Sequence, residues 1–265
     1  MLAKCYEELS KIVPSHKESL EAAQCVEQHR LVWRPPSVHT VLLAESHVLT
    51  DDSELQMMRG CSQATTHRRL HQTFARFVYC LGYGEHEFAG PALPSTSGTS
   101  QFWKIFASCV RTPGPEAFAP LQKGTNPSFA ARIQAKLSVL EAMHKLGVWL
   151  VDASPVALST GSERVHPKND PKVLKCSWQH YSKKLVEDAK PHSIVVVGKG
   201  VERALRAELS TLQGVEIHAV AQPQGCRKQG AFEEVLATVH RVCQAAAAAR
   251  GALGSGDKVA AAHQL

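Results

Sequence analysis

Several common signatures are missing from this sequence of 265 residues. Its eight cysteines include no C-x-x-C pair, which excludes the usual spacing of a zinc ribbon or a cysteine-ligated cluster. No run approaches the roughly 20 apolar residues that span a bilayer. The first residues, Met1 to Glu8, lack the apolar centre of a secretory signal. We therefore expect a soluble protein inside the cell (cytosolic, nuclear or organellar) with reduced thiols and no metal or cofactor.

Motifs of phosphate-binding and hydrolytic enzymes are missing too. The segment Gly198-Lys199-Gly200 is not part of G-x-x-x-x-G-K-[ST], and Arg203 occupies the third glycine position of G-x-G-x-x-G. A G-x-S-x-G elbow is absent, which makes an α/β-hydrolase-like enzyme the least favoured function. His67 and His71 have a metal-compatible spacing, but no glutamate completes H-E-x-x-H. We interpret them as part of a solvated basic helix face.

The composition that remains is that of a globular protein. Hydrophobic residues make up 44% and charged residues 20% of the chain, and its length suits one large domain. The net charge of +6 is compatible with a polyanionic partner such as nucleic acid. An ordinary basic surface explains the same charge equally well.

Four short segments predict strands, at Val38–Ala44, Val148–Val151, Ser193–Val197 and Val215–Ala221, and three of them are near-continuous apolar runs of the kind found in buried strands. Segments in which apolar residues recur at helical spacing lie between these strands or follow them. They predict helices at Thr65–Leu81, Gln101–Val110, Ser128–Leu146, Pro171–Ala189, Val201–Leu212 and Ala231–Arg250. This alternation predicts a single-domain α/β fold, a three-layer αβα sandwich around a central, mainly parallel four-stranded sheet.

Proline and glycine residues that interrupt helices and strands indicate the domain boundaries. Residues 1–36 are predicted to form an N-terminal segment of two helices that is broken at Pro14, with Ser15 as cap of the second. Residues 37–250 form the α/β domain, with a loop at Arg111–Pro127. The tail of residues 251–265 is expected to be disordered.

Polar residues follow each predicted strand. Parallel sheets bind their ligands at the carboxyl ends of the strands, so these residues are the candidates for a site. The four ends are Glu45-Ser46-His47, Asp152-Ala153-Ser154-Pro155, Gly198-Lys199-Gly200 and Gln222-Pro223-Gln224-Gly225.

The order of these strand ends resembles the uracil-DNA glycosylase superfamily, over Val38 to about Val242. In that superfamily the first strand ends in a water-activating motif written GQDPY or GEAPG. A middle strand ends in an Asn-containing motif that reads the base, and the last strand ends in HPS-type residues on a DNA-penetrating loop. The resemblance implies DNA as the partner, and hydrolysis of the bond between base and deoxyribose without a metal.

The sequence also departs from the superfamily pattern. The first motif keeps an acid, Glu45, but not its flanking glycine or early proline, and Gln222 replaces the histidine of HPS. Asp152 stands where the superfamily usually has asparagine. An ionised carboxylate only accepts hydrogen bonds, so the base that such a site reads stays open.

The resemblance implies roles for the residues at the first two strand ends. Glu45 is expected to orient or deprotonate a water, and His47 to assist it or to contact a phosphate. Their alternatives are a helix cap or loop salt bridge for Glu45 and a structural histidine for His47. Asp152 is the candidate for base or sugar recognition, with an Asx-type turn as its alternative.

Two further groups complete the predicted site. An extruded base needs a platform to stack on, for which Phe88 and Phe102 are candidates. Phe102, like Trp103 beside it, is equally explained as a core residue. DNA contacts are assigned to two strand ends and the cations that follow, where ordinary turns are the alternative; they are Lys199, Gln222, Gln224, Arg227 and Lys228.

The sequence therefore predicts a divergent uracil-DNA glycosylase-like protein that removes uracil or a deaminated base from DNA, as in base excision repair. The alternative is a catalytically inactive module on the same fold that binds nucleic acid or nucleotides. A site bounded by Glu45, Asp152 and Gln222 favours the enzyme. A site filled by side chains favours the module.

Overall fold

A four-stranded sheet forms the centre of the molecule. The computed structural model describes residues 1–14, 17–55, 73–85, 99–161, 163–165 and 170–262, and only the backbone from residue 250 onward. The strands pair in the order β2-β1-β3-β4, and every pair is parallel. They are β1 (Thr40–Ala44), β2 (Val148–Asp152), β3 (Ser193–Val197) and β4 (Glu216–Val220).

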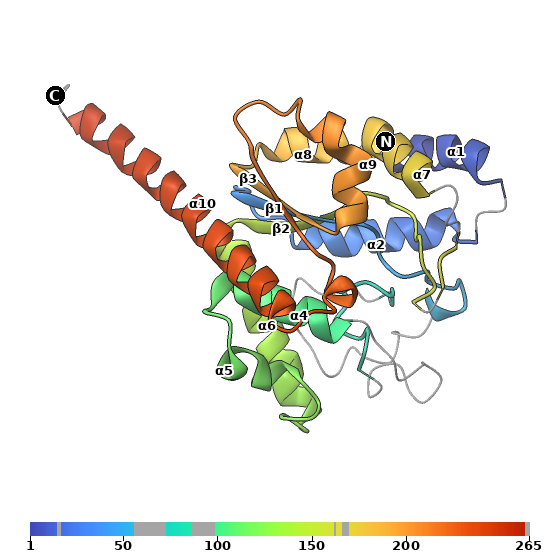
Figure 1. Cartoon of the computed structure of the whole chain (residues 1–265), viewed down its shortest axis with the longest axis horizontal. Coiled ribbons are helices and arrows are strands. Elements are labelled where there is room, and N and C mark those ends of the chain that lie inside the picture. Colours follow the sequence, from blue (N-terminus) through green and yellow to red (C-terminus); the bar gives the residue numbers. More distant parts are fainter. Residues whose placement is uncertain (15–16, 56–72, 86–98, 162, 166–169, 263–265) are drawn as a thin grey trace.

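Helices cover both faces of the sheet, which confirms the predicted three-layer αβα architecture (Figure 1). One layer contains α4 (Thr99–Val110), α6 (Phe129–Leu146) and α10 (Ala231–Ala262). The other contains α1 (Leu2–Ile12), α7 (Asp170–Ser177), α8 (Lys183–Ala189) and α9 (Lys199–Leu209). No helix of the described part has the length and apolarity to cross a membrane.

Burial along the strands follows from this coverage. Every residue of β1, β2 and β3 is buried, because helices pack on both faces of their β-branched and aliphatic runs. The edge strand β4 differs, since Glu216 is exposed and the side chain of Ile217 is 37% exposed. The three apolar strands therefore hold the core, and their carboxyl ends are fixed relative to one another.

The N-terminal segment forms two helices, as predicted, but the second starts later than expected. Helix α1 ends before Pro14, and α2 (Leu20–Val32) begins after Ser19. The Ser19 hydroxyl caps α2 by accepting the backbone N–H of Ala22. Ser15, which was predicted as the cap, lies outside the described residues, and the described cap of α2 is Ser19.

The predicted helix at Thr65–Leu81 is wrong in its described part. Residues 73–81 form turns, and residues 65–72, with His67 and His71, lie outside the described residues. The helical spacing of Phe74, Phe77 and Leu81 reflects burial in the core. The predicted loop at Arg111–Pro127 also contains two short helices, α5 (Pro115–Phe118) and η3 (Ala119–Leu121).

The C-terminal helix is longer than predicted. It was expected to end at Arg250, but α10 continues to Ala262 and extends away from the sheet (Figure 1). A disordered tail was expected from residue 251, where the backbone continues as helix. Alanine is the strongest helix former and no proline interrupts this stretch, so the backbone continues the helix through its glycines.

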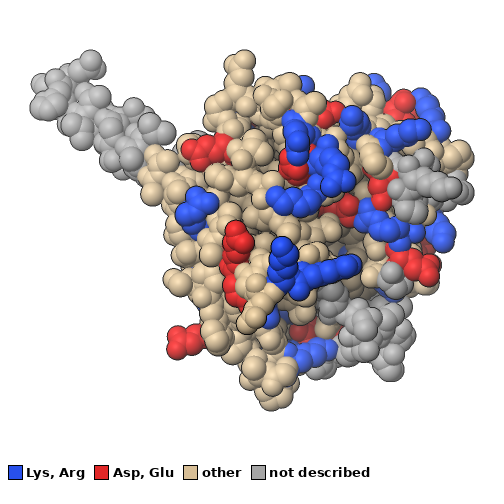
Figure 2. Space-filling view, in the orientation of Figure 1, with Lys and Arg blue, Asp and Glu red and all other residues tan. Residues whose placement is uncertain are grey.

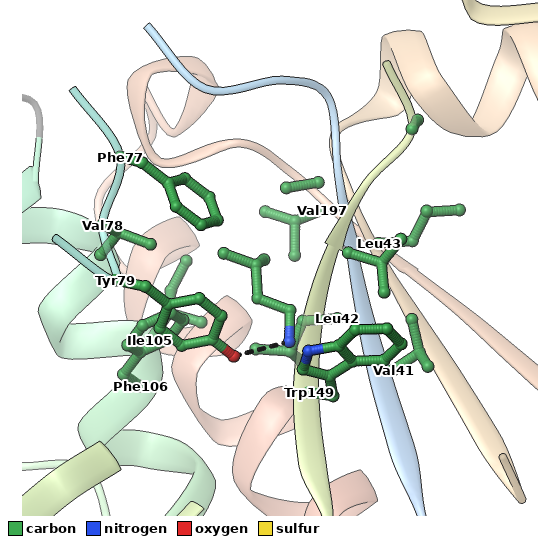
Figure 3. Close-up of a cluster of buried hydrophobic side chains, with 14 of the residues drawn as sticks. Val41, Leu42, Leu43, Phe77, Val78, Tyr79, Ile105, Phe106, Trp149 and Val197 are labelled. Carbon is green, nitrogen blue, oxygen red and sulfur yellow. Dashed lines mark hydrogen bonds between the residues drawn. The ribbon is translucent and has the colours of Figure 1, made fainter. Parts of the chain in front are cut away.

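The open edge of β2 is covered by the turns at residues 73–85. The backbone N–H of Leu150 donates to the Tyr79 hydroxyl, with a distance of 2.8 Å between the two atoms. Figure 3 shows this bond beside Phe77, Phe106 and Trp149. On the same strand, the Trp149 indole donates to the backbone carbonyl of Arg30 in α2. Side chains thus satisfy an edge that would otherwise offer unpaired backbone groups.

We expect Tyr79→Phe to lower the free energy of unfolding by about 1–3 kcal/mol, because the buried Leu150 N–H loses its acceptor. Urea titration followed by circular dichroism measures the change. Tyr83→Phe is the matched control, in a half-buried tyrosine of the same turns, and should change stability by less than about 0.5 kcal/mol. Equal stability of the Tyr79 variant and the wild type would refute this role.

Candidate active site at the carboxyl edge of the sheet

Glu45 lies at the carboxyl end of β1, where its side chain is 16% exposed. The guanidinium of Arg164 binds both of its oxygens, with Nη2 at 2.9 Å from Oε1 and Nη1 bonded to Oε2. Arg164 also donates from Nε to Oδ2 of Asp170, at 2.9 Å. One arginine therefore joins two carboxylates that come from different parts of the chain.

Local structure brings these three residues together. Backbone bonds from Ala153 N–H to the Ala44 carbonyl and from Ser154 N–H to the Glu45 carbonyl extend the β1–β2 pairing past the strands. Arg164 lies on a turn that pairs with Ser159. Asp170 is the first residue of α7, where a carboxylate faces the positive end of the helix.

Gln222 and the start of α9 complete the surroundings of Glu45. The Gln222 amide nitrogen lies 3.5 Å from Glu45 Oε2. Gly198 has φ +129°, and a Cβ there would lie 3.1 Å from Gln222 Cγ, so both the backbone and the space favour glycine. A Cβ on Gly200 would lie 3.9 Å from Glu45 Oε1. The ends of β1, β3 and β4 therefore converge on this carboxylate.

We call Glu45, Arg164, Asp170 and Gln222 the Glu45 cluster. The hydrogen bonds that Arg164 donates to Glu45 and Asp170 raise the pKa of Arg164 above its usual range, so the guanidinium stays charged. Two carboxylates against one cation leave one negative charge in excess. Oδ1 of Asp170 is buried and has no hydrogen-bond partner within the described chain. The cluster thus contains an acceptor that is not used.

His47 and Asp152 belong to a buried group of charges that we call the His47 network: Glu18, Glu27, Arg30, His47 and Asp152. The imidazole Nε2 of His47 lies 2.8 Å from Glu18 Oε1, and its Nδ1 lies 3.5 Å from Asp152 Oδ2. Arg30 donates to the same Asp152 oxygen at 2.8 Å. These are the contacts of a structural histidine and of a carboxylate in a buried ion pair.

Asp152 was predicted to lie where a strand passes into a loop, with its side chain directed into a crevice. It is the last residue of β2, pairs in register with Ala44, and is 2% exposed. Its carboxylate binds Arg30 and not the backbone of an Asx turn. The structure brings Glu45 and Gln222 together, while Asp152 is joined to His47.

The His47 network makes stability depend on pH. Burial lowers the pKa of His47, but the carboxylates of Glu18 and Asp152 outweigh burial and raise it to about 9. A raised pKa stabilises the fold fully below the unfolded value of 6.5, and this stabilisation is lost as the pH rises through about 9. We expect a loss on the order of 3 kcal/mol across this window.

Urea unfolding at steps between pH 6 and about 9.5 tests this dependence. His47→Gln should remove most of the slope, because glutamine does not titrate. His192→Gln, which changes a partly exposed histidine, should keep the slope of the wild type. Parallel stability curves for the wild type and His47→Gln would show that the network does not hold a protonated imidazole.

Of the two predicted stacking residues, the structure describes only Phe102. Phe102 lies on α4, partly buried against the core, and its neighbour Trp103 is 2% exposed in that core. Of the two interpretations of Phe102, a stacking platform and a core residue, this position agrees with the core residue. Phe88 lies outside the described residues.

The residues assigned to DNA contacts are mostly exposed. Lys199 begins α9, and its ammonium donates to the backbone carbonyl of Ala219 at 3.3 Å. Gln224, Arg227 and Lys228 lie exposed after β4, in and beyond η5 (Pro223–Gly225). Figure 2 shows Lys and Arg side chains over α9 and over the segment after β4. This surface therefore offers cations next to the Glu45 cluster.

Sequence reasoning missed two members of the cluster, Arg164 and Asp170. Arg164 lies in an irregular segment where no periodicity marks it. Asp170 directly precedes Pro171, and this pair of residues is typical of the start of a helix. That signal could have predicted a carboxylate at the amino end of α7. Neither residue follows a predicted strand, so the rule that sites lie at strand ends did not predict them.

Within the described residues, no group of three or more His, Cys, Asp and Glu side chains is arranged to hold a metal ion. Seven of the cysteines are free thiols, of which Cys5, Cys25, Cys80, Cys109 and Cys243 are buried. No family model, curated protein or solved structure matches this chain. Functional conclusions therefore depend on the geometry of the cluster and on the order of the strand ends.

Proposed function

We propose that the chain is a divergent DNA N-glycosylase that hydrolyses the bond between a deaminated base and deoxyribose. The contact between Glu45 and Gln222 carries this proposal. These residues are 177 positions apart, follow the first and last strands, and meet beside the start of α9. The resemblance expects a water-activating acid and a DNA-inserting loop at these two strand ends.

The chemistry available to the cluster is acid–base and electrostatic. The Glu45 carboxylate accepts a hydrogen bond from a water and orients it toward the sugar carbon as the base departs. The departing base carries negative charge, which the amino end of α9 and the Lys199 ammonium stabilise. Arg164 holds both Glu45 oxygens and must release one of them to admit the water. A DNA phosphate competes for that guanidinium.

The decisive experiment uses labelled oligonucleotides that contain uracil, hypoxanthine or xanthine, in single and double strands. An alkali-labile site at the modified base would support the proposal and identify the base. Absence of product on every substrate, from folded protein that binds these oligonucleotides, would contradict it.

A binding module without catalysis is the second candidate, favoured by a different observation. Arg164 neutralises Glu45 from both oxygens, and the Asp152 carboxylate is buried against Arg30, so the carboxylates are engaged by side chains. Such a module binds DNA through Lys199, Arg227 and Lys228 with an affinity that falls steeply with salt. Salt dependence alone is common to both candidates, so the product assay separates them.

A further inference from the structure

The strand β4 forms the second edge of the sheet, opposite to β2. The backbone N–H of Glu216 donates to the His192 carbonyl at 2.9 Å, so the backbone groups of Glu216 point toward β3. This direction alternates along a strand, so Ile217 and Ala219 direct their N–H and C=O groups away from β3. In the part of the chain that the structure describes, the Lys199 ammonium bonds the Ala219 carbonyl, and no residue bonds the N–H or the carbonyl of Ile217.

Ile217 adds an apolar side chain to this edge. Three large hydrophobic residues are exposed in the described chain, Met1, Leu31 and Ile217, and of these Ile217 alone lies on a strand. An edge strand that combines unpaired backbone groups with an exposed apolar side chain is a template for pairing with another strand. The edge of β2 shows the contrast, because the Tyr79 hydroxyl already accepts its Leu150 N–H.

Glu216 and His218 give the same edge a polar pattern. Their side chains lie on one face of the sheet and flank Ile217, whose side chain lies on the other face. The Glu216 side chain is 60% exposed, and His218 Nε2 lies 3.5 Å from its Oε2. The Glu216 carboxylate is therefore accessible to a further donor. A neighbouring strand that carries an imidazole at the opposing position would supply one.

We propose that β4 pairs antiparallel with β4 of a second copy of this chain, about a two-fold axis at Ile217. The outward groups of the two Ile217 residues then exchange both N–H···O=C bonds, as in the hydrogen-bonded pair of an antiparallel ladder. Residues one position before and after the axis oppose each other, so Glu216 of each copy lies opposite His218 of the other. An unrelated strand lacks this matching pair, so the charges select a second copy as the occupant.

This pairing leaves both Glu45 clusters accessible. In an antiparallel pair the carboxyl edges of the two sheets face in opposite directions, so each copy keeps its own strand ends open to ligand. The contact is small, because β4 has only five residues and Lys199 already bonds the Ala219 carbonyl. We therefore expect a reversible dimer with a Kd on the order of 10–100 µM. The inference is independent of the proposed function.

Sedimentation velocity over a range of concentrations should show a monomer–dimer equilibrium for the wild-type chain. Ile217→Lys should raise the Kd by at least about tenfold, because two ammonium groups would face each other at the axis. Leu31→Lys is the matched control, since it changes an exposed leucine on α2 and should keep the Kd of the wild type. Far-UV circular dichroism and urea unfolding check that each variant is folded.

Two charge variants test the pairing register. Glu216→Lys and His218→Glu should each associate more weakly than the wild type, since each loses both complementary pairs in its own dimer. An equal mixture of the two should associate about as tightly as the wild type. In the mixed dimer the new lysine faces the new glutamate, and the unchanged His218 faces the unchanged Glu216. Mixing restores no contact within either copy, so only pairing between copies explains this recovery.

Three results would overturn the inference. The first is a wild-type chain that stays monomeric up to concentrations on the order of 100 µM. The second is unchanged association of Ile217→Lys, which would place the contact on another surface. The third is a mixture of the charge variants that associates no better than either variant alone, which would reject the two-fold register.

Discussion

Arg30→Met is expected to destabilise the protein by about 3–5 kcal/mol, the cost of leaving buried charges without their partner. Arg30 is 1% exposed, bonds both Glu27 and Asp152, and lies 5.1 Å from the centre of the Phe77 ring. Methionine fills a similar volume but leaves both carboxylates without their cation. Such a loss is a large fraction of the stability of an ordinary domain.

Thermal and urea unfolding measure this effect, with an expected decrease in Tm on the order of 10 °C. Arg34→Met is the matched control, since Arg34 stacks on Trp149 at the surface end of the same segment and should cost less than about 1 kcal/mol. Adding Asp152→Asn to Arg30→Met should recover part of the loss, because one unpaired charge is removed. A loss below about 1 kcal/mol for Arg30→Met would show that the ion pairs do not stabilise the fold.

Glu45→Gln is expected to lower the glycosylase rate by about 10²–10⁴-fold, the usual contribution of a general base. Glutamine has nearly the same shape but no longer accepts a proton. The side chain is partly exposed, so stability should change by less than about 1 kcal/mol. Affinity for DNA should change little, because phosphate contacts dominate it.

Single-turnover cleavage of the substrate identified in the product assay measures this rate. Glu163→Gln is the matched control, an exposed glutamate next to Arg164 in sequence, and should retain the rate of the wild type. An unchanged rate in Glu45→Gln would assign water activation to another group. A loss shared by the control would point to a disturbed Arg164 turn.

The layered fold was predictable from the sequence because its signals are local. The run Ser193–Val197 contains no charged residue, which indicates a buried strand. The structure has β3 with the same bounds. Where tertiary contacts determine the local structure, the prediction from the sequence was wrong. The spacing around Phe77 is helical, but the hydroxyl of Tyr79 is needed by the edge of β2, and the segment forms turns.

The candidate site was predictable in part for a similar reason. Glu45 and Gln222 follow strands, and the sheet alone brings strand ends together. Arg164, which binds the Glu45 carboxylate, lies on an irregular turn, and Asp170 lies at the start of a helix. Neither position is marked by a periodic pattern of apolar residues. Burial of Asp152 depends on a cation in α2, 122 positions away, which no local pattern reveals.

The strand order has a consequence for where a ligand can enter. From β1 the chain crosses to β2 on one side through the α4–α6 layer, whereas from β3 it crosses to β4 on the other side through α9. The connections that leave the adjacent strands β1 and β3 therefore diverge, and open α/β sheets bind ligands at such a topological switch point. Glu45 and Gly198 are the residues that follow these two strands. Chain topology alone, independently of the side chains, therefore makes the position of the Glu45 cluster the expected place for a ligand.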